Sequence, residues 1–281
     1  MPTGYRTARH RTLPIPLIRL AAIVFAAGLL QGPAYAQTPE NTGPPPASEP
    51  APAQTPSLRD DIKAFATEPA RWRGRDWLKV AGIAAAVGVA YHYDDKVHEH
   101  FARDGEPNYH EVVDAMPAAF VFGGVWFAAK LAHNEEAQWE SLAMRRALVL
   151  ETLSSEVMKV AFRRKRPGPG VPADHWGGGG LSFPSGHTAA AFAIGTVFAE
   201  SGDDRHRRWR RVLGYGMGAV TGYLRLDHDA HWLSDTVAGA ALGIGAAKFV
   251  MKRRSGTEPR GAFSVLPMNG GTMLTYTVPL R

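Results

Sequence analysis

Apolar residues recur at helical spacing along most of this chain. Between residues 138 and 162 they fall every three to four positions, at Trp139, Leu142, Leu150, Leu153, Val157 and Val160. This period is typical of one buried face of an α-helix. Similar patterns predict further helices at 57–72, 77–91, 112–131, 188–200, 209–224 and 233–251. We therefore expect an all-α fold, a bundle of about six to seven helices within residues 57–255.

Small residues crowd the last of these helices. They are Ala238, Gly239, Ala240, Ala241, Gly243, Gly245, Ala246 and Ala247. Such residues permit close helix contacts in a protein core or in lipid. The Gly-rich stretch 177–180 interrupts the bundle and predicts a loop.

The first 56 residues follow a different pattern. Four arginines precede an apolar run at 20–30, and Ala34-Tyr35-Ala36 follows it. This order predicts a signal peptide over 1–36 and an exported, periplasmic protein; an uncleaved anchor is the alternative. Residues 37–56 are rich in Pro and Ala, which predicts a disordered linker.

The carboxyl terminus changes from helical to alternating patterns. Two short runs, 262–266 and 272–278, flank Asn269-Gly270, and such a pair predicts a β-hairpin within 261–281. Because an isolated hairpin is marginally stable, we expect it to pack on the bundle or on a partner.

Composition narrows the possible functions. The chain has no cysteine, so no disulfide stabilises it and no thiolate is available for a zinc site. All four charged side chains in residues 1–36 are arginines, so the net charge falls from +6 to +2 after cleavage. The basic pI therefore gives no reason to expect nucleic acid as a partner.

Three clusters of polar residues follow one another in a fixed order. Lys159 precedes Arg166-Pro167, then comes Pro184-Ser185-Gly186-His187, and last come Arg225, His231 and Asp235. A phosphoryl group needs permanent cations and donors from several directions. Lys159, Arg166 and Arg225 supply the cations. Ser185 and Gly186 should lie where a loop becomes a helix, whose free N–H groups attract anions.

Two histidines complete these clusters. His187 and His231 can serve as acid and nucleophile, because a histidine proton moves near neutral pH. Asp235 lies four residues after His231. On a helix the two would share a face, and the carboxylate could orient the imidazole.

The three clusters resemble the motifs of the superfamily of type 2 phosphatidic acid phosphatases, bacterial non-specific acid phosphatases and vanadium haloperoxidases, over about residues 140–250. The resemblance implies that His231 forms a phosphohistidine, His187 protonates the leaving alcohol and Asp235 positions His231. It implies no metal and no other cofactor. The phosphate would be held by Lys159, Arg166, Ser185, Gly186 and Arg225. Leu224 departs from the family's usual serine, so the hydrogen bond of that serine is absent.

Two other interpretations of the clusters remain open. The first is a non-catalytic module that binds phosphate or phospholipid, and the second is a vanadate-dependent haloperoxidase. A metal site is the less favoured interpretation of Asp227, His228, Asp229, His231 and Asp235. The acidic and histidine-rich stretch 92–100 is expected to be an exposed helix end.

The apolar runs leave the relation to the membrane open. They reach about 12 to 16 residues, whereas a spanning helix usually needs about 20. We expect a compact bundle associated with the inner membrane surface, with an integral protein as the alternative. Basic clusters at 163–166, 205–211 and 252–254 would meet anionic headgroups or remain solvated. The substrate is expected to be a phosphorylated lipid or a small phosphomonoester.

Overall fold

The protein is described from a computed structural model. It covers residues 56–101, 135–202 and 204–255, short helical pieces at 115–116, 118–119 and 122–127, and the strand backbone at 262–268 and 271–277. The predicted signal peptide, nearly all of the predicted linker and most of the predicted helix at 112–131 lie outside these residues.

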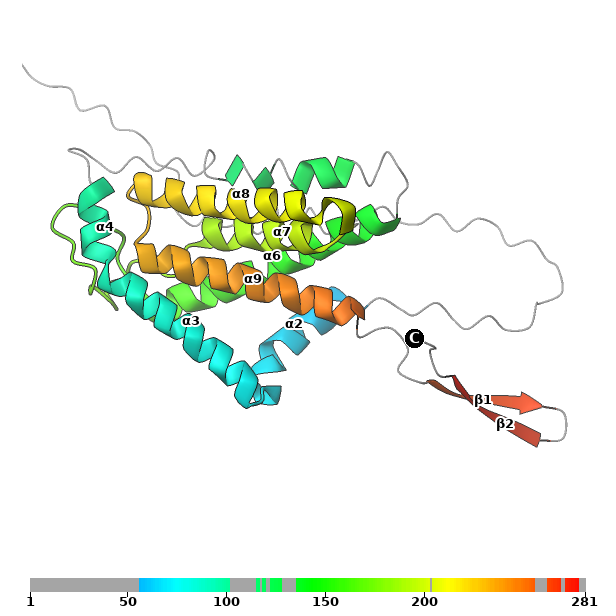
Figure 1. Ribbon diagram of the computed structural model, residues 1–281. Helices are drawn as coiled ribbons and strands as arrows, with labels where there is room; N and C mark the ends of the chain where they lie inside the picture. Colours follow the sequence, from blue (N-terminus) through cyan, green and yellow to red (C-terminus); the bar gives the residue numbers. More distant parts are fainter. Residues whose placement is uncertain are drawn as a thin grey trace, which may run out of the picture. The chain divides into compact units, whose positions relative to one another are not determined.

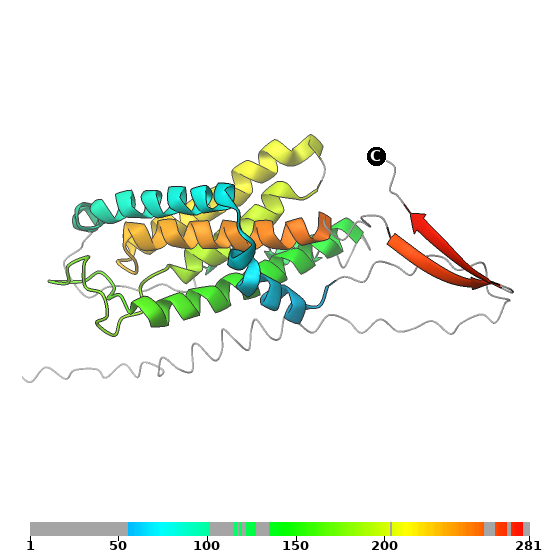
Figure 2. The ribbon, with the colours of Figure 1, turned by 90° about the horizontal axis from the view of Figure 1, so that it is seen from below.

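Helices make up most of the described part of the chain up to Ser255, as the apolar periodicity predicts. Figures 1 and 2 show the longer ones lying side by side. The central helix, α7, contacts α6, α8 and α9. The elements are α2 (Leu58–Thr67), η1 (Glu68–Arg71), α3 (Gly74–His92), α4 (Asp94–Phe101), α6 (Glu135–Phe162), α7 (Gly186–Glu200), η2 (Asp204–His206), α8 (Arg207–Asp227) and α9 (Leu233–Ser255).

Glycines let α7 approach its neighbours closely. A Cβ added at Gly243 of α9 would overlap the Ala189 carbonyl of α7, and one added at Gly195 of α7 would overlap the Gly214 carbonyl of α8. The small residues predicted to allow close contacts in the last helix thus meet α7. The core around them contains Met144, Leu150, Ile194, Val197, Phe249 and Val250.

Several members of the basic clusters pair with carboxylates of the protein. Arg253 of α9 and Arg146 of α6 both bind the buried Asp61 of α2, at 2.6 and 2.8 Å. In the 205–211 cluster, Arg210 pairs with Glu140 and Arg211 with Glu200. Arg210 and Arg253 are thus largely engaged with the protein's own carboxylates, whereas the Arg211 side chain is still half exposed to solvent, as expected for a solvated cluster.

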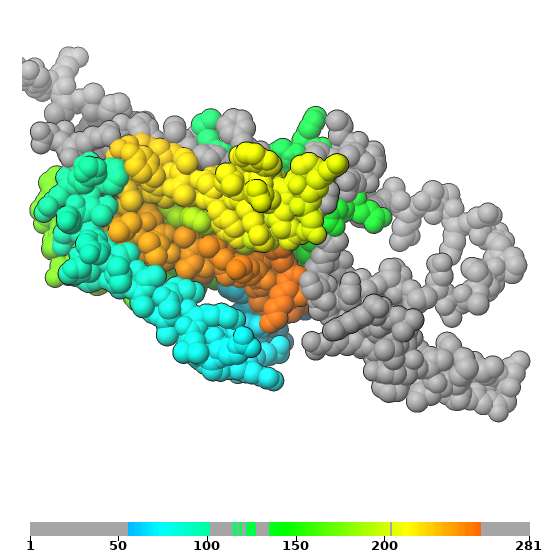
Figure 3. All heavy atoms as spheres, in the orientation of Figure 1, coloured from blue at the N-terminus to red at the C-terminus, as the bar shows by residue number. Residues whose placement is uncertain are grey.

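Three helices expose large apolar side chains. Those of α8 are Trp209, Val212, Leu213, Val220 and Tyr223, each more than half exposed, and Figure 3 shows α8 and α3 on the surface with α9 between them. Within the described part of the chain, one segment has the length and composition of a membrane span. It is Leu233–Arg253 in α9, and 56% of it is buried in the protein.

Two strands follow the helices. β1 (Ala262–Met268) and β2 (Gly271–Thr277) pair antiparallel, with Val265 opposite Leu274. Their side chains lie outside the described residues, so packing on the bundle or on a partner stays a prediction.

Candidate active site

The three polar clusters meet at one end of the bundle. The carboxyl ends of α6 and α8 and the amino ends of α7 and α9 lead into it. The backbone joins the clusters directly, because the amide of Ser185 donates to the carbonyl of Asp235 at 3.0 Å and the amide of Ser182 donates to that of Arg164 at 3.0 Å. Gly180 lets the two loops run together, since a Cβ there would overlap the Arg164 carbonyl.

The predicted change from loop to helix occurs at the second cluster. α7 begins at Gly186, and Ser185 is its N-cap residue. The Ser185 hydroxyl lies 2.9 Å from that of Thr188. A Cβ added at Gly186 would lie 3.2 Å from the Lys159 ammonium of α6. The first and second clusters are thus in contact, and the positive end of the α7 dipole lies beside a lysine.

His231 is surrounded by the cations that the sequence singles out. Its side chain is almost completely buried. Burial lowers its pKa well below 6.5, and the positive charges of Arg166, Arg225, Lys159 and His187 lower the pKa further. The structure therefore brings the three predicted cations and His187 close enough to act on one imidazole. A neutral His231 at neutral pH follows from this environment.

His231 does not share a helix with Asp235, contrary to the expectation from their spacing. It lies in the turn between α8 and α9, and its amide and that of Ala230 donate to the Arg225 carbonyl. Asp235 is in the first turn of α9 and accepts from the Trp232 amide at 3.0 Å, as an N3 carboxylate of a helix does. This cap brings Oδ2 of Asp235 to 3.5 Å from Nδ1 of His231.

Ser182 contacts both His231 and Asp235. Its hydroxyl donates to Asp235 Oδ2 at 2.5 Å and lies 3.4 Å from His231 Nδ1. Burial raises the pKa of Asp235 to about 6, while the charge of Arg164 and the Ser182 hydrogen bond act in the opposite direction. Because Nδ1 faces Asp235 and Ser182, Nε2 is the nitrogen left to face a ligand.

Sequence reasoning missed Arg164 and Asp94. Asp94 opens α4 and is completely buried, so the expectation of an exposed helix end at 92–100 is wrong at this residue. Arg164, from the 163–166 cluster, is also completely buried and pairs with Asp94 at 2.6 Å and with Asp235 at 2.7 Å. Arg164 was missed because a run of charges usually marks a solvated face. Asp94 was missed because it lies 70 positions from Arg164, so no local sequence pattern links the two.

Residues 141–257 match the family model of the PAP2 superfamily. The matching stretch, called the PAP2 segment here, covers less than half of the chain. The resemblance carried by Lys159, His187 and His231 is thereby confirmed, and all eight predicted site residues lie in the PAP2 segment.

One relative and two solved structures are similar to this chain. A lipid A 1-phosphatase from Porphyromonas gingivalis is 30% identical over 168 residues, which cover 58% of this chain and 35% of that protein. The chain thus spans about a third of that relative's length. Aquifex aeolicus LpxE is 23% identical, with 51% of this chain and 88% of that chain covered and a TM-score of 0.38. The first transmembrane PAP2 type phosphatidylglycerolphosphate phosphatase from Bacillus subtilis is 18% identical, with 72% and 96% covered and a TM-score of 0.37.

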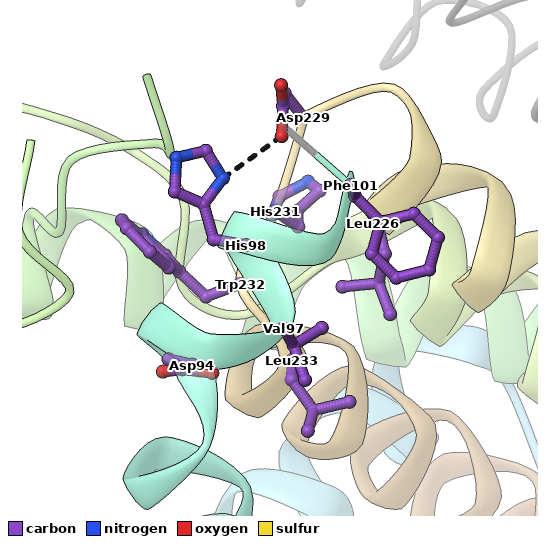
Figure 4. Close-up of a pocket in the computed structure, with 9 residues that line it drawn as sticks. All are labelled: Asp94, Val97, His98, Phe101, Leu226, Asp229, His231, Trp232 and Leu233. Carbon is purple, nitrogen blue, oxygen red and sulfur yellow. Dashed lines mark hydrogen bonds and ion pairs between the residues drawn. The ribbon is translucent and has the colours of Figure 1, made fainter. Parts of the chain in front are cut away.

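A small pocket opens beside His231 where α4 meets the turn before α9 (Figure 4). Nδ1 of His98 lies 3.1 Å from the Asp229 carboxylate, and the His98 ring packs edge-on against Trp232. Asp229 holds a positive φ of 50°, which aspartate tolerates better than most residues. α4, which precedes the PAP2 segment in the chain, therefore forms one wall of this pocket beside His231.

The metal interpretation of the third cluster gains no support from the geometry. In the part of the chain that the structure describes, no three His, Asp or Glu side chains are arranged to hold a metal ion. His231 and Asp235 face each other and the surrounding cations, while Asp229 faces His98.

Leu224, which stands where the family usually has serine, is half-buried one residue before Arg225.

Proposed function

We propose that this protein is a lipid phosphatase, which cleaves a phosphomonoester of a lipid outside the cytoplasm through a phosphohistidine. The observation that carries the proposal is the environment of His231. Its imidazole is buried, Nδ1 is turned toward Asp235 and Ser182, and the charges of Arg166, Arg225, Lys159 and His187 all act on it. Such a site offers a neutral nucleophile to an anion.

The reaction that we propose has two steps. In the first, Nε2 of His231 attacks phosphorus, the bond from phosphorus to the ester oxygen breaks, and His187 gives its proton to the leaving alcohol. In the second, His187 takes a proton from water, the water oxygen attacks the phosphorus, the bond from phosphorus to Nε2 of His231 breaks, and inorganic phosphate leaves. Lys159, Arg166 and Arg225 would balance the charge on the phosphoryl oxygens in both steps. The family resemblance implies that neither step uses a metal.

The lipid part of the proposal has two supports. The Porphyromonas gingivalis relative is a lipid A 1-phosphatase, which makes a phosphorylated lipid the first substrate to test. The described helices also expose large apolar side chains such as Trp209, Leu213, Val157 and Val160, and groups of such side chains mark membrane or partner contact sites. Export rests on the predicted signal peptide.

The test is hydrolysis of a substrate panel by the mature protein with and without detergent. We expect phosphate release from a lipid phosphate with EDTA present, inhibition by vanadate, and loss of at least about a thousandfold in kcat for His231→Ala, because removal of a nucleophile leaves only binding effects. His206→Ala is the control, because His206 is exposed at the amino end of α8.

Three outcomes would contradict the proposal. Full activity of His231→Ala would exclude the phosphohistidine. Phosphate binding without turnover across the panel would favour a binding module. Halide oxidation after addition of vanadate would favour a haloperoxidase.

A further inference from the structure

A chain of buried charges leads from α4 to the Nδ1 side of His231. Its first member is Asp94, whose side chain has no exposure to solvent. Asp94 Oδ2 accepts from Arg164 at 2.6 Å and from the Ser234 hydroxyl at 2.6 Å, while Oδ1 accepts from the Ser234 amide at 2.8 Å. A carboxylate of α4 thus caps the amino terminus of α9, a favourable place for negative charge.

Arg164 connects Asp94 to the residue beside the proposed nucleophile. Its second amino group donates to Asp235 Oδ1 and to the Ser234 hydroxyl, both at 2.7 Å. The Ala173 carbonyl accepts from Nε at 3.1 Å, and the Trp176 ring lies 4.5 Å from the guanidinium carbon. The planar guanidinium is held by these partners, so Arg164 fixes Oδ1 of Asp235, while the Trp232 amide and the Ser182 hydroxyl hold Oδ2.

We propose that Asp94 and Arg164 are positioning residues for the phosphoryl transfer, because they fix Asp235 and set the charge that it presents to His231. This inference rests on the function proposed above. Neither residue would touch the substrate. Asp94 acts through Arg164 and Ser234, and Arg164 acts through Asp235.

The charges around His231 explain why such a chain is needed. Four positive groups act on its imidazole: Lys159 of α6, Arg166 of the following loop, His187 of α7 and Arg225 of α8. Asp235 is the carboxylate nearest to the ring among the ion pairs described, at 3.5 Å from Nδ1. When Nε2 bonds to phosphorus, the imidazole becomes positive among these cations. Two carboxylates that share one guanidinium keep a net charge of −1 behind the ring, and this charge stabilises the positive imidazole.

Exchange of Asp94 for asparagine tests the inference. The Asp94→Asn variant makes the buried chain neutral, so we expect kcat to fall by about tenfold, which corresponds to about 1.4 kcal/mol. KM and inhibition by inorganic phosphate should stay within about twofold, because the cations that would hold phosphate are unchanged. Glu99→Gln, which removes an exposed carboxylate from the same helix, is the control and should match the wild type.

The acid limb of the pH profile separates positioning from a merely structural role. Asp235 has a pKa of about 6, so we expect wild-type activity to decline as Asp235 is protonated near that pH. In Asp94→Asn, Asp235 is the one carboxylate that still pairs with Arg164, so its pKa should fall and the acid limb should move to lower pH. In Arg164→Lys, a single ammonium cannot bridge both carboxylates; Asp235 then loses a donor, and the limb should move to higher pH.

The outcomes that overturn the inference differ from those that overturn the proposed function. An acid limb at the wild-type pH in the folded variants would overturn it, whatever the loss of kcat, because a structural loss lowers turnover equally at every pH. Thermal unfolding establishes which variants fold, and if Asp94→Asn does not, Arg164→Lys decides. A wild-type protein without turnover would instead contradict the phosphatase proposal itself.

Discussion

Glu151 is a carboxyl group buried in the middle of α6, two turns before Lys159. The hydroxyls of Thr152 and Ser155 donate to it, at 2.9 and 3.3 Å. These donors and the charge of Lys159 do not compensate for burial, which raises its pKa to about 8. At neutral pH this side chain therefore keeps its proton.

This proton makes the stability of the fold depend on pH. The pKa of Glu151 is higher in the folded protein than the ordinary 4.5, so its contribution is fully present below pH 4.5 and is lost as the pH rises through 8. We expect the melting temperature of the Glu151→Gln variant, relative to the wild type, to rise between pH 5 and pH 8. Thermal unfolding at both values checks this, with Glu99→Gln as control; equal shifts at both would contradict it.

At the residue scale, the sequence predicted the members of the site better than their supports. Lys159, His187 and His231 carry the motif spacing, and the structure brings them together. Arg164 and Asp94 carry none, because their pairing depends on where α4 packs. Ser182 was missed for the same reason, since three residues before Ser185 it resembles any polar loop residue.

At the element scale, the position of α7 depends on small residues of α9. Gly239 and Gly243 leave no space between the two helices, and Cβ atoms there would overlap the carbonyls of Ser185 and Ala189. Ser185 is also the residue before the first turn of α7. The position of the second cluster is therefore set by a packing contact as well as by its own loop.

Alanine substitutions separate packing from site geometry. We expect Gly243→Ala to cost about 1–3 kcal/mol, as overpacked cores do, and Gly239→Ala to cost a similar amount and also to lower kcat, because it displaces Ser185. Gly245→Ala is the matched control. No atom lies within 4 Å of its added Cβ, and in a helix interior alanine is favoured over glycine by about 0.5–1 kcal/mol. Denaturant unfolding and kcat of the three variants check this.

The periodicity of the chain predicted the long helices but not the turns that matter for the site. Apolar positions report which side of a helix is buried, so α6, α8 and α9 were found within a few residues of their ends. The turn that carries His231 has no such period, and His231 and Asp235 were placed on one helix. Backbone bonds from residues 230 and 231 to the Arg225 carbonyl produce the turn instead.

At the scale of the whole molecule, apolar side chains on α8 make a continuous outward stripe. Trp209, Leu213, Val220 and Tyr223 recur at helical spacing and are all more than half exposed. Each such side chain gains about 1.5–3 kcal/mol when it leaves water. A lipid surface would supply that burial, in agreement with the lipid substrate proposed above.

Binding to lipid vesicles tests this stripe. We expect the protein to float with vesicles in a density gradient and the Trp209→Ser/Leu213→Ser variant to float at least about tenfold less, because two large apolar groups are lost. Arg208→Ser, an exposed neighbour on the same helix, should float as the wild type does. If the Trp209→Ser/Leu213→Ser variant floats as well as Arg208→Ser does, the prediction is contradicted. Vesicle binding of both that also resists an alkaline carbonate wash would indicate an integral membrane protein.

The cap that α4 places on α9 bears on how this protein could be shortened or recombined. The segment that matches the superfamily starts at residue 141, so a fragment cut at that boundary, or a chimera built from it, would keep Arg164, Asp235 and His231 but lose Asp94. A fully buried arginine would then face one carboxylate instead of two, and the amino terminus of α9 would lose an acceptor. The smallest unit expected to retain the full site therefore begins before α4.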